Sequence, residues 1–584
     1  MDSIEAVKPV AKEGKVSDTL EVFNPVAARN ELRFEPSKRV TSLKGLTVGL
    51  VWNFKVGGNV AMRRIAENLK RELGYTFNVV EFSDEFPFAE STVENIADTC
   101  DCVIASTGDC GSCTSWLIHD VIEIEKKGTP AVALVTHPFT EDAETTAEIF
   151  GMPQVRFAIM DADTLTNLND QQIFKTADAV SEQIVNGLTK ERGVPAAPPA
   201  IKPPSAYRIE KFSGTDSTKA WEAFNRHYLD KGWSDGFPLI PPTEAKVRDM
   251  MATCNRAPDD VITVLAPGMG VATTKIVAIN AVMAGCVPAQ FPVLLAALTA
   301  MAKPEYRLRT VAMSTGPHAP MMVVNGPIVE ELGINYGRGA LGPGKNSWAN
   351  TVLGRSVRLC LMNVGHSYIG TLDLDTIGSP NKYSMCLAEN EQASPWEAYH
   401  VSRGGFREDE STVTMFGVES QLEIYDYKNH TPETLLTTIA GTIIGVGALA
   451  SRAWMYPRRK PDNCLLLCPD HANVVANAGW NKKDVQDFLY HKARIPAGQF
   501  KNCDDGKRIK SGWRWIMDAP DDTPIPILSG PDAFHVVVVG GPSGKSGYTT
   551  GVGTSTIEGV DQFRRKQRSR AWRRTRRRHV SQRP

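Results

Sequence analysis

Regular alternation between strand-like and helix-like segments over residues 46–190 restricts the fold of this chain more than any other feature. Short apolar runs rich in branched residues, such as LTVGLVWN and DCVIAST, are each followed by a stretch with apolar residues at helical spacing. Strands and helices that alternate in this way form a parallel sheet with helices on both faces. We therefore predict a doubly wound, flavodoxin-like α/β domain over residues 46–190.

A proline-rich spacer ends this alternation. The segment GVPAAPPAIKPPSAY contains five prolines among alanines, a composition typical of a semi-rigid linker. A chain of 584 residues is also too long for a single core. The predicted parts are a 1–45 N-terminal extension, the first domain, a 191–207 linker, a 208–545 second domain of mixed α+β type, and a disordered 546–584 tail. Periodicity does not predict the topology of the second domain.

The net charge of −1 hides an Arg-rich end. Residues 564–584 hold ten Arg and one Lys without any acidic residue, which leaves 54 basic against 66 acidic residues in the rest of the chain. An acidic body of this kind does not favour nucleic-acid binding, except through the basic tail. The tail has no apolar face to bury, so we expect it to be disordered.

Several features indicate a cytoplasmic protein. The N-terminus, MDSIEAVKPVAKEGK, has early acidic residues and no apolar core of a secretory signal. Eleven irregularly spaced cysteines suit a reducing compartment rather than a disulfide scaffold. The apolar segment 434–453 is about long enough to span a bilayer, but it is rich in Thr and Gly and lacks flanking aromatic residues. We interpret it as a buried helix and expect no membrane association.

A C-x-x-C pair, Cys110 and Cys113, lies between a predicted strand and a predicted helix in ASTGDCGSCTSWLIHD. Ligands and catalytic groups gather at the carboxyl ends of strands in open parallel sheets. The unpaired N–H groups and the dipole of a helix N-terminus stabilise a thiolate, which lowers a cysteine pKa from about 8.5 toward 7 or below. The position favours a reactive dithiol, and a buried structural pair is the alternative.

A zinc site is the third interpretation of this cysteine pair. Such a site needs four converging ligands, and Cys102 begins the strand that Cys110 follows, so several residues at about 3.3 Å each separate their sulfurs. The sequence has no second C-x-x-C and no H-x-x-x-H. We therefore predict no metal site.

Residues that follow neighbouring strands are candidate partners of the pair. His137 follows the strand VALVT and would share the sheet edge of Cys110, where it could act as acid or base toward a thiol. A hydrogen bond to its own turn is the alternative. Asn53 lies in the glycine-rich loop WNFKVGGN, whose N–H groups could bind an anion, and Thr107 ends the strand before Cys110. We predict that Asn53 and Thr107 contact the substrate.

A predicted strand, followed by STGDCGSC and a predicted helix, resembles the family named for its U-G-S-C motif. The first position of that motif is selenocysteine in some members and cysteine in others. Four stretches of the second domain look like further signatures of that family: GWSDGFPLIPPT, STGPHAPMMVVNGPI, GRGALGPG and GSPNKYSMCLAENEQASPW. Selenocysteine at the position of Cys110 implies a nucleophilic or redox role, because a selenolate is ionised at neutral pH. The resemblance implies no particular substrate.

The second domain contributes five further candidates for substrate binding: Asp235, His318, Asn325, Arg355 and Lys382. All lie in or near Gly- and Pro-rich stretches, where binding residues concentrate. Arg355 or Lys382 could hold a substrate carboxylate. An aspartate before glycine is also typical of an Asx-turn, and a structural role is the alternative for each of the five.

A glycine-rich segment, VVVVGGPSGKSG, resembles a nucleotide-binding loop but fails on spacing. The P-loop pattern needs a glycine five residues before the glycine of GKS, and valine occupies that position here. We predict neither a nucleotide nor a metal cofactor, and the sequence leaves any other cofactor unknown.

These features together predict a thiol-dependent enzyme that acts on a small organic substrate. Cys110 would be the nucleophile or redox centre, and Cys113 the resolving or supporting thiol. Reductive cleavage through a disulfide and a covalent adduct that ends in elimination or transfer both fit. The expected partners are the small-molecule substrate and a thiol reductant, with a homo-oligomer left open. A non-catalytic redox-sensing or ligand-binding module is the alternative.

Overall fold

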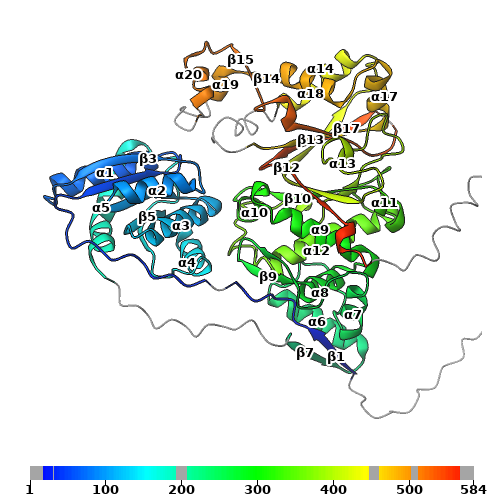
Figure 1. Ribbon diagram of the computed structural model, residues 1–584, viewed down its shortest axis with the longest axis horizontal. Helices are drawn as coiled ribbons and strands as arrows, with labels where there is room; N and C mark the ends of the chain where they lie inside the picture. The colour runs from blue at the N-terminus through cyan, green and yellow to red at the C-terminus, as the bar shows by residue number, and fades with distance from the viewer. Residues whose placement is uncertain are drawn as a thin grey trace, which may run out of the picture.

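A computed structural model of the chain shows two bodies of secondary structure (Figure 1). It describes residues 18–30, 32–191, 207–445, 460–501, 509, 511–542 and 544–565. Three predicted features lie wholly or mainly outside these residues: the 191–207 linker, the second part of the 434–453 segment, and the Arg-rich tail beyond Arg565.

The first domain is built on a parallel five-stranded sheet. Its strands are β2 (Thr47–Trp52), β3 (Asn78–Ser83), β4 (Cys102–Gly108), β5 (Ala131–Thr136) and β6 (Arg156–Met160). Their spatial order is β3-β2-β4-β5-β6. In chain order this is 2-1-3-4-5, the order of flavodoxin-like folds. The predicted doubly wound domain is therefore confirmed.

Helices cover both faces of this sheet (Figure 1). They are α1 (Gly58–Arg71), α2 (Glu90–Thr99), α3 (Gly111–Lys126), α4 (Thr140–Ile149) and α5 (Asp170–Thr189). Alternate residues of one strand enter different cores: Leu50 packs with α1 and α5, and Val51 packs with α2, α3 and α4. Because both faces are buried, the strands are continuously apolar, which is why the sequence pattern identified them.

The second domain contains a mixed seven-stranded sheet in the order β11-β10-β12-β17-β13-β16, with β18 also paired to β12. The strands are β10 (Ala319–Asn325), β11 (Cys386–Ala388), β12 (Thr412–Tyr425), β13 (Asn463–Leu467), β16 (Phe534–Val538), β17 (Lys545–Gly551) and β18 (Thr556–Gly559). The 14-residue strand β12 holds the sheet together, because it pairs with β10, β17 and β18.

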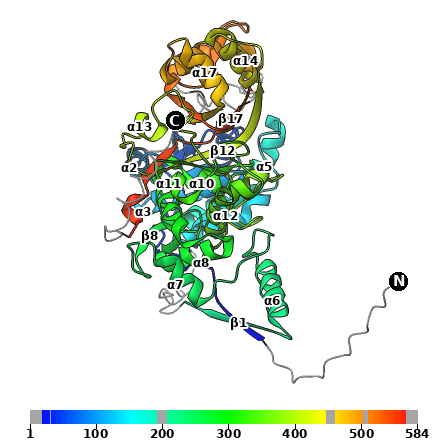
Figure 2. The ribbon, with the colours of Figure 1, turned by 90° about the vertical axis from the view of Figure 1, so that its right-hand side faces the viewer.

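Helices of this domain form two main groups (Figures 1 and 2). One core includes α6 (Ser217–Asp230), α7 (Glu244–Met251), α8 (Thr274–Ala284), α9 (Phe291–Met301) and α12 (Trp348–Asn363). Another includes α14 (Pro432–Ile444), α17 (Pro469–Asn477) and α18 (Lys482–Lys492). The described part of the 434–453 segment is thus a core-packed helix, and no helix among the described residues has the length and apolarity needed to cross a bilayer.

Shorter elements complete the second domain. The helices are α10 (Leu308–Ala312), α11 (Ile328–Leu332), α13 (Tyr399–Ser402), α19 (Ala497–Lys501) and α20 (Trp515–Asp518). Two small antiparallel pairs are β8 (Val261–Leu265) with β9 (Gly270–Thr273), and β14 (Arg494–Pro496) with β15 (Pro524–Pro526).

The N-terminal extension belongs in part to the second domain. Strand β1 (Asp18–Phe23) pairs antiparallel with β7 (Ile209–Gly214), which follows the first domain in the chain. Beyond β1, the N–H of Ala27 donates to the Asn363 carbonyl at 3.0 Å. From β1 onward, the described chain therefore pairs first with the second domain, then forms the first domain, and then returns to the second.

The predicted start of the disordered tail at residue 546 is wrong. Strand β17 lies between β12 and β13, and β18 pairs with β12. The sequence KSGYTTG misled because its small residues suggest a loop. A Cβ atom at Gly551 would collide with the Asp462 carbonyl oxygen, so close strand packing explains that glycine. The preceding glycine-rich segment also leads into this strand, whereas a P-loop leads into a helix.

Candidate functional site

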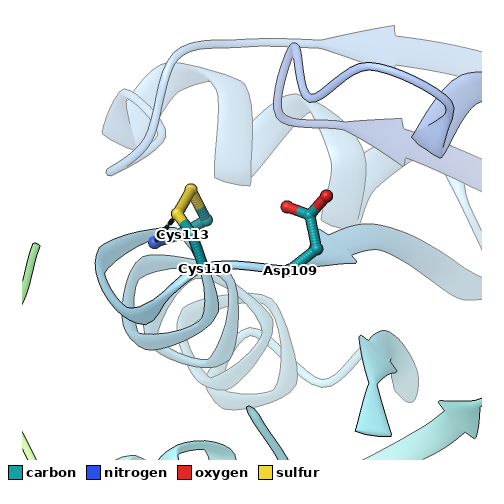
Figure 3. A group of neighbouring side chains, drawn as sticks. All are labelled: Asp109, Cys110 and Cys113. Carbon is teal, nitrogen blue, oxygen red and sulfur yellow. Dashed lines mark hydrogen bonds between the residues drawn. A yellow bond between two sulfur atoms is a disulfide. The ribbon is translucent and has the colours of Figure 1, made fainter. Parts of the chain in front are cut away.

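Cys110 and Cys113 lie where β4 turns into α3, as the sequence pattern predicted. Cys110 is the N-cap residue of α3, and its Sγ accepts a hydrogen bond from the Cys113 N–H at 3.3 Å. A disulfide joins the two residues (Figure 3). Cys110 is half-buried, whereas Cys113 is only 5% exposed. An approaching molecule therefore reaches Cys110 more readily than Cys113.

Asp109 lies next to the pair and points to the same side of the chain (Figure 3). Its carboxylate is buried, with one oxygen 3.2 Å from Nζ of Lys55 and the other accepting from the Thr164 hydroxyl at 3.0 Å. The cation offsets much of the carboxylate's effect on the sulfurs. Lys55 is not among the residues predicted from the sequence, although it belongs to the glycine-rich loop after β2 and so to the same sheet edge.

A carboxylate oxygen of Asp109 and the two sulfurs lie within 4.8 Å of one another, which makes this the one group with metal-binding geometry among the described residues. A metal would need the sulfurs as thiolates rather than as a disulfide. It would also compete with Lys55 for the carboxylate. The three side chains fall short of the four ligands of a closed zinc site.

His137 lies at the predicted edge of the sheet. Val135 of β5 is in register with Gly108 of β4, so His137 and Cys110 each follow a matched pair by two residues. The imidazole is exposed and, within the described part of the chain, makes no hydrogen bond or ion pair. The Thr140 hydroxyl donates to its carbonyl at 2.9 Å. A proton-transfer role for His137 remains a prediction.

Asn53 and Thr107 are brought together, but they bind each other. The Asn53 amide donates to the Thr107 carbonyl at 3.0 Å and accepts from the Thr107 N–H at 2.9 Å. Neither residue is exposed. This pairing fastens the loop after β2 to the end of β4, and a substrate contact for either residue remains a prediction.

The turn that contains Gly111 contacts the second domain. A Cβ atom at Gly111 would collide with the Met313 carbonyl oxygen and would lie 2.8 Å from Cδ1 of Leu374. One turn further along α3, the Ser115 hydroxyl accepts from Arg309 at 2.8 Å. The cysteine motif therefore lies at the interface between the two domains.

Arg355 is engaged by protein groups. Its guanidinium binds both carboxylate oxygens of Asp235, at 2.7 and 2.8 Å, and donates to the carbonyls of Phe237 and Pro238. Asp235 also accepts from the Phe237 N–H at 3.2 Å, as in an Asx-turn. The pair fastens the GWSDGFP loop to α12.

We expect Arg355→Lys to lower the free energy of unfolding by about 1–2 kcal/mol, because lysine cannot make the bidentate contact with the Asp235 carboxylate. Urea unfolding followed by circular dichroism measures the change. Arg248→Lys is the control, since Arg248 is exposed and its distance to Asp249 is 3.9 Å. Equal stability of the two variants would show that the Arg355 contacts contribute nothing.

The other three candidates of the second domain also have protein partners. His318 Nε2 lies 2.8 Å from Glu419, and the Asn325 amide donates to Glu389 and Glu391 at 2.6 and 2.8 Å. Lys382 binds Asp373 and Asp375 at 2.8 and 2.7 Å. In the described part of the chain no hydrogen bond or ion pair links these residues to the cysteine pair, and their substrate role remains a prediction.

Glu419 lines a cavity of about 790 Å³ on the sheet of the second domain. Its wall includes residues of three of the four predicted signature stretches: Pro317, Gly339–Gly342 and Gly378–Asn381. His318 approaches this cavity through its contact with Glu419. Three of the four signature stretches thus line a hollow of ligand size, at a place different from the cysteine pair.

Comparison with known proteins finds a family match for the first part of the chain. Residues 21–190 match the UGSC family. One similar solved structure is a mutant flavo-diiron protein from Thermotoga maritima, with 18% sequence identity and a TM-score of 0.17. The alignment covers 25% of this chain and 36% of that chain, so it spans about a third of the other protein's length. No curated protein matches the sequence.

Proposed function

The chain carries a UGSC-family domain over residues 21–190, and from this premise we propose that it is a thiol-dependent enzyme that acts on a small organic substrate. Cys110 is the attacking residue and Cys113 the resolving residue. One observation supports this assignment above the others. Cys110 is a half-buried N-cap residue whose sulfur accepts an N–H from the helix, beside a second, buried cysteine.

The proposed reaction is reductive cleavage of a sulfur–sulfur bond. The Cys110 thiolate attacks one substrate sulfur, the bond breaks, and the leaving thiolate takes up a proton. The Cys113 thiolate then attacks the Cys110 sulfur and releases the second substrate thiol. Two electrons and two protons pass from the dithiol to the substrate, and the Cys110–Cys113 disulfide remains. A thiol reductant returns the enzyme to the dithiol form.

Local electrostatics support Cys110 as a thiolate. The helix N-terminus provides the Cys113 N–H, and Lys55 offsets the charge of Asp109. The negative charge of Asp109 opposes a thiolate at Cys110, and its ion pair with Lys55 weakens that opposition. His137 is retained as the proton donor to the leaving thiolate, because it follows β5 at the same sheet edge.

Most other cysteines are poor nucleophiles by comparison. The free cysteines described are all buried. Burial raises the pKa of Cys100 to about 11 and those of Cys102 and Cys286 to about 12. Cys468 differs: burial raises its pKa, but hydrogen bonds and charge from His471, together with a hydrogen bond with Ser546, outweigh burial and hold the pKa below the usual range, although the thiol is 1% exposed.

After mild reduction, we expect iodoacetamide to label Cys110 before the other cysteines, at a pH below that needed for an ordinary thiol. Peptide mass spectrometry at several pH values measures the order of labelling. Cys113→Ser is the matched variant. Because Cys110 then has no disulfide partner, iodoacetamide should label it even without prior reduction, and Cys110 should trap a mixed disulfide with the substrate. Cys110 that stays unlabelled in the reduced native protein would contradict the proposal.

A redox-sensing module is the second candidate. The packing of Gly111 against Met313 and Leu374 favours it, because a change at the cysteine pair would reach the second domain directly. A sensor would release product only once for each Cys110–Cys113 disulfide that forms. An enzyme would release several equivalents of thiol product per chain when a reductant such as dithiothreitol is in excess, which chromatographic quantification of the product thiol measures against a control without the protein. Product release limited to one equivalent would favour the sensor.

A further inference from the structure

Three buried side chains that interact one with the next lie far from the cysteine pair in the sequence. The hydroxyl of Tyr399 on α13 lies 2.6 Å from Nδ1 of His535 on β16. Nε2 of the same imidazole lies 3.0 Å from Oδ2 of Asp462. The three residues are 3%, 2% and 7% exposed. Buried groups of this kind are costly unless they are paired, and here each is paired with the next.

The direction of the hydrogen bonds follows from the carboxylate. Asp462 also accepts from the N–H and the hydroxyl of Ser555, at 2.8 and 2.9 Å, and as a carboxylate it can only accept. The His535 Nε2–H therefore donates to Asp462, and Nδ1 accepts from the Tyr399 hydroxyl. The Tyr399 hydroxyl thus gives its proton to His535, and its oxygen, which also interacts with the Ser555 side chain, keeps a lone pair that can accept a hydrogen bond from another molecule.

Tyr399 and His535 also line a cavity of about 330 Å³ beside β16. The volume is within the range of small-molecule sites. Trp396 provides an apolar wall, and α18 contributes Lys482 and Lys483. Burial and neighbouring acidic groups raise the pKa of Tyr399 above its usual range, so its hydroxyl stays protonated at neutral pH.

Arg403 is the unpaired cation of this cavity. Lys482 binds Glu389 at 3.1 Å and Lys483 binds Asp487 at 2.5 Å. Arg403 donates to the Asp532 carbonyl at 2.6 Å and lies 3.4 Å from His535. It forms no ion pair with any carboxylate of the described residues. Its charge is therefore available to an anionic ligand.

We propose that this cavity is a second ligand site, separate from the cysteine pair, and that it binds a small hydroxycarboxylate. The ligand carboxylate contacts Arg403, and its hydroxyl donates to the Tyr399 oxygen. The Tyr399 proton is directed to His535, whose other N–H is fixed by Asp462. An apolar part of the ligand lies against Trp396. This site does not depend on the proposed reaction at Cys110.

Two probe molecules that differ by one hydroxyl test the proposal: 3-phenyllactate and 3-phenylpropionate. Isothermal titration of the full chain should show 3-phenyllactate binding about 2- to 10-fold more tightly, the contribution of one neutral hydrogen bond. Tyr399→Phe should remove this difference and leave the affinity for 3-phenylpropionate unchanged. A purely structural Tyr399 would not change the ratio between the two ligands.

Arg403→Gln should weaken both ligands at least about tenfold, because a charge-assisted contact is lost. Lys483→Gln is the matched control and should bind both as the wild type does, since Lys483 already has an acidic partner. Arg403 is exposed, so its variant should fold even if Tyr399→Phe does not. The proposal is overturned if neither probe binds at millimolar concentration, if both cation variants behave alike, or if inorganic phosphate binds where the carboxylates do not.

Discussion

Truncation after Gly544 will abolish soluble folded protein, whereas truncation after Arg565 will leave thermal unfolding unchanged. The shorter chain lacks β17, which separates β12 from β13 in the sheet. Its loss leaves two rows of backbone N–H and C=O groups without partners in a buried sheet. The yield of soluble protein, circular dichroism and thermal melting measure the outcome.

The size of this effect follows from the side chains of β17 as well. Tyr548 is fully buried and packs in the core formed with α14, α17 and α18. Loss of one large aromatic side chain from a core costs about 3–5 kcal/mol, and whole domains are stable by about 5–15 kcal/mol. Arg564 is kept in the longer chain because it binds Glu331 at 2.5 Å. Cooperative unfolding of the 1–544 chain would refute the central position of β17.

The second large effect is expected at Gly111. Gly111→Ala should lower the free energy of unfolding by about 1–3 kcal/mol, because the new methyl group overlaps the Met313 carbonyl and the Leu374 side chain. The cost falls on the domain interface, since the backbone of Gly111 is helical and accepts alanine. Urea unfolding measures stability, and small-angle X-ray scattering measures whether the two domains separate.

Gly441→Ala is the matched control for this substitution. Gly441 also lies in a helix, α14, but a Cβ atom there meets no other atom within 4 Å. Alanine should therefore stabilise the protein by about 0.5–1 kcal/mol, the usual gain within a helix. The two substitutions should change stability in opposite directions. A stabilising effect at Gly111 would mean that the second domain does not pack on the cysteine motif.

The sequence predicted the first domain well because local signals determine its fold. Strands such as β4 and β5 are buried on both faces and are therefore uniformly apolar, and each is followed by an amphipathic helix. The strand-to-helix turn also placed Cys110 at a helix N-terminus, where the structure has it. Element lengths and order were enough for these predictions.

The second domain was less predictable because its sheet is assembled from distant segments. Strand β12 is buried over its first part and alternates over its second, so no single period describes it. Strand β17 is rich in glycine and threonine and pairs with residues of β12 that lie 120 or more positions earlier in the chain. The contact between Arg355 and Asp235 likewise joins residues 120 positions apart. Local patterns contain no information about such pairings.

The pairing of β1 with β7 makes the first domain an insertion within the second. During synthesis, β1 leaves the ribosome about 190 residues before its partner strand, which at 5–20 residues per second is a delay of roughly 10–40 s. The flavodoxin-like domain has all its strands by then and can fold first. Once folded, it replaces a long random coil by a compact spacer between β1 and β7, which lowers the entropic cost of closing that loop. Substitutions that slow folding of the inserted domain should therefore delay the pairing of β1 with β7, even though they lie outside these two strands.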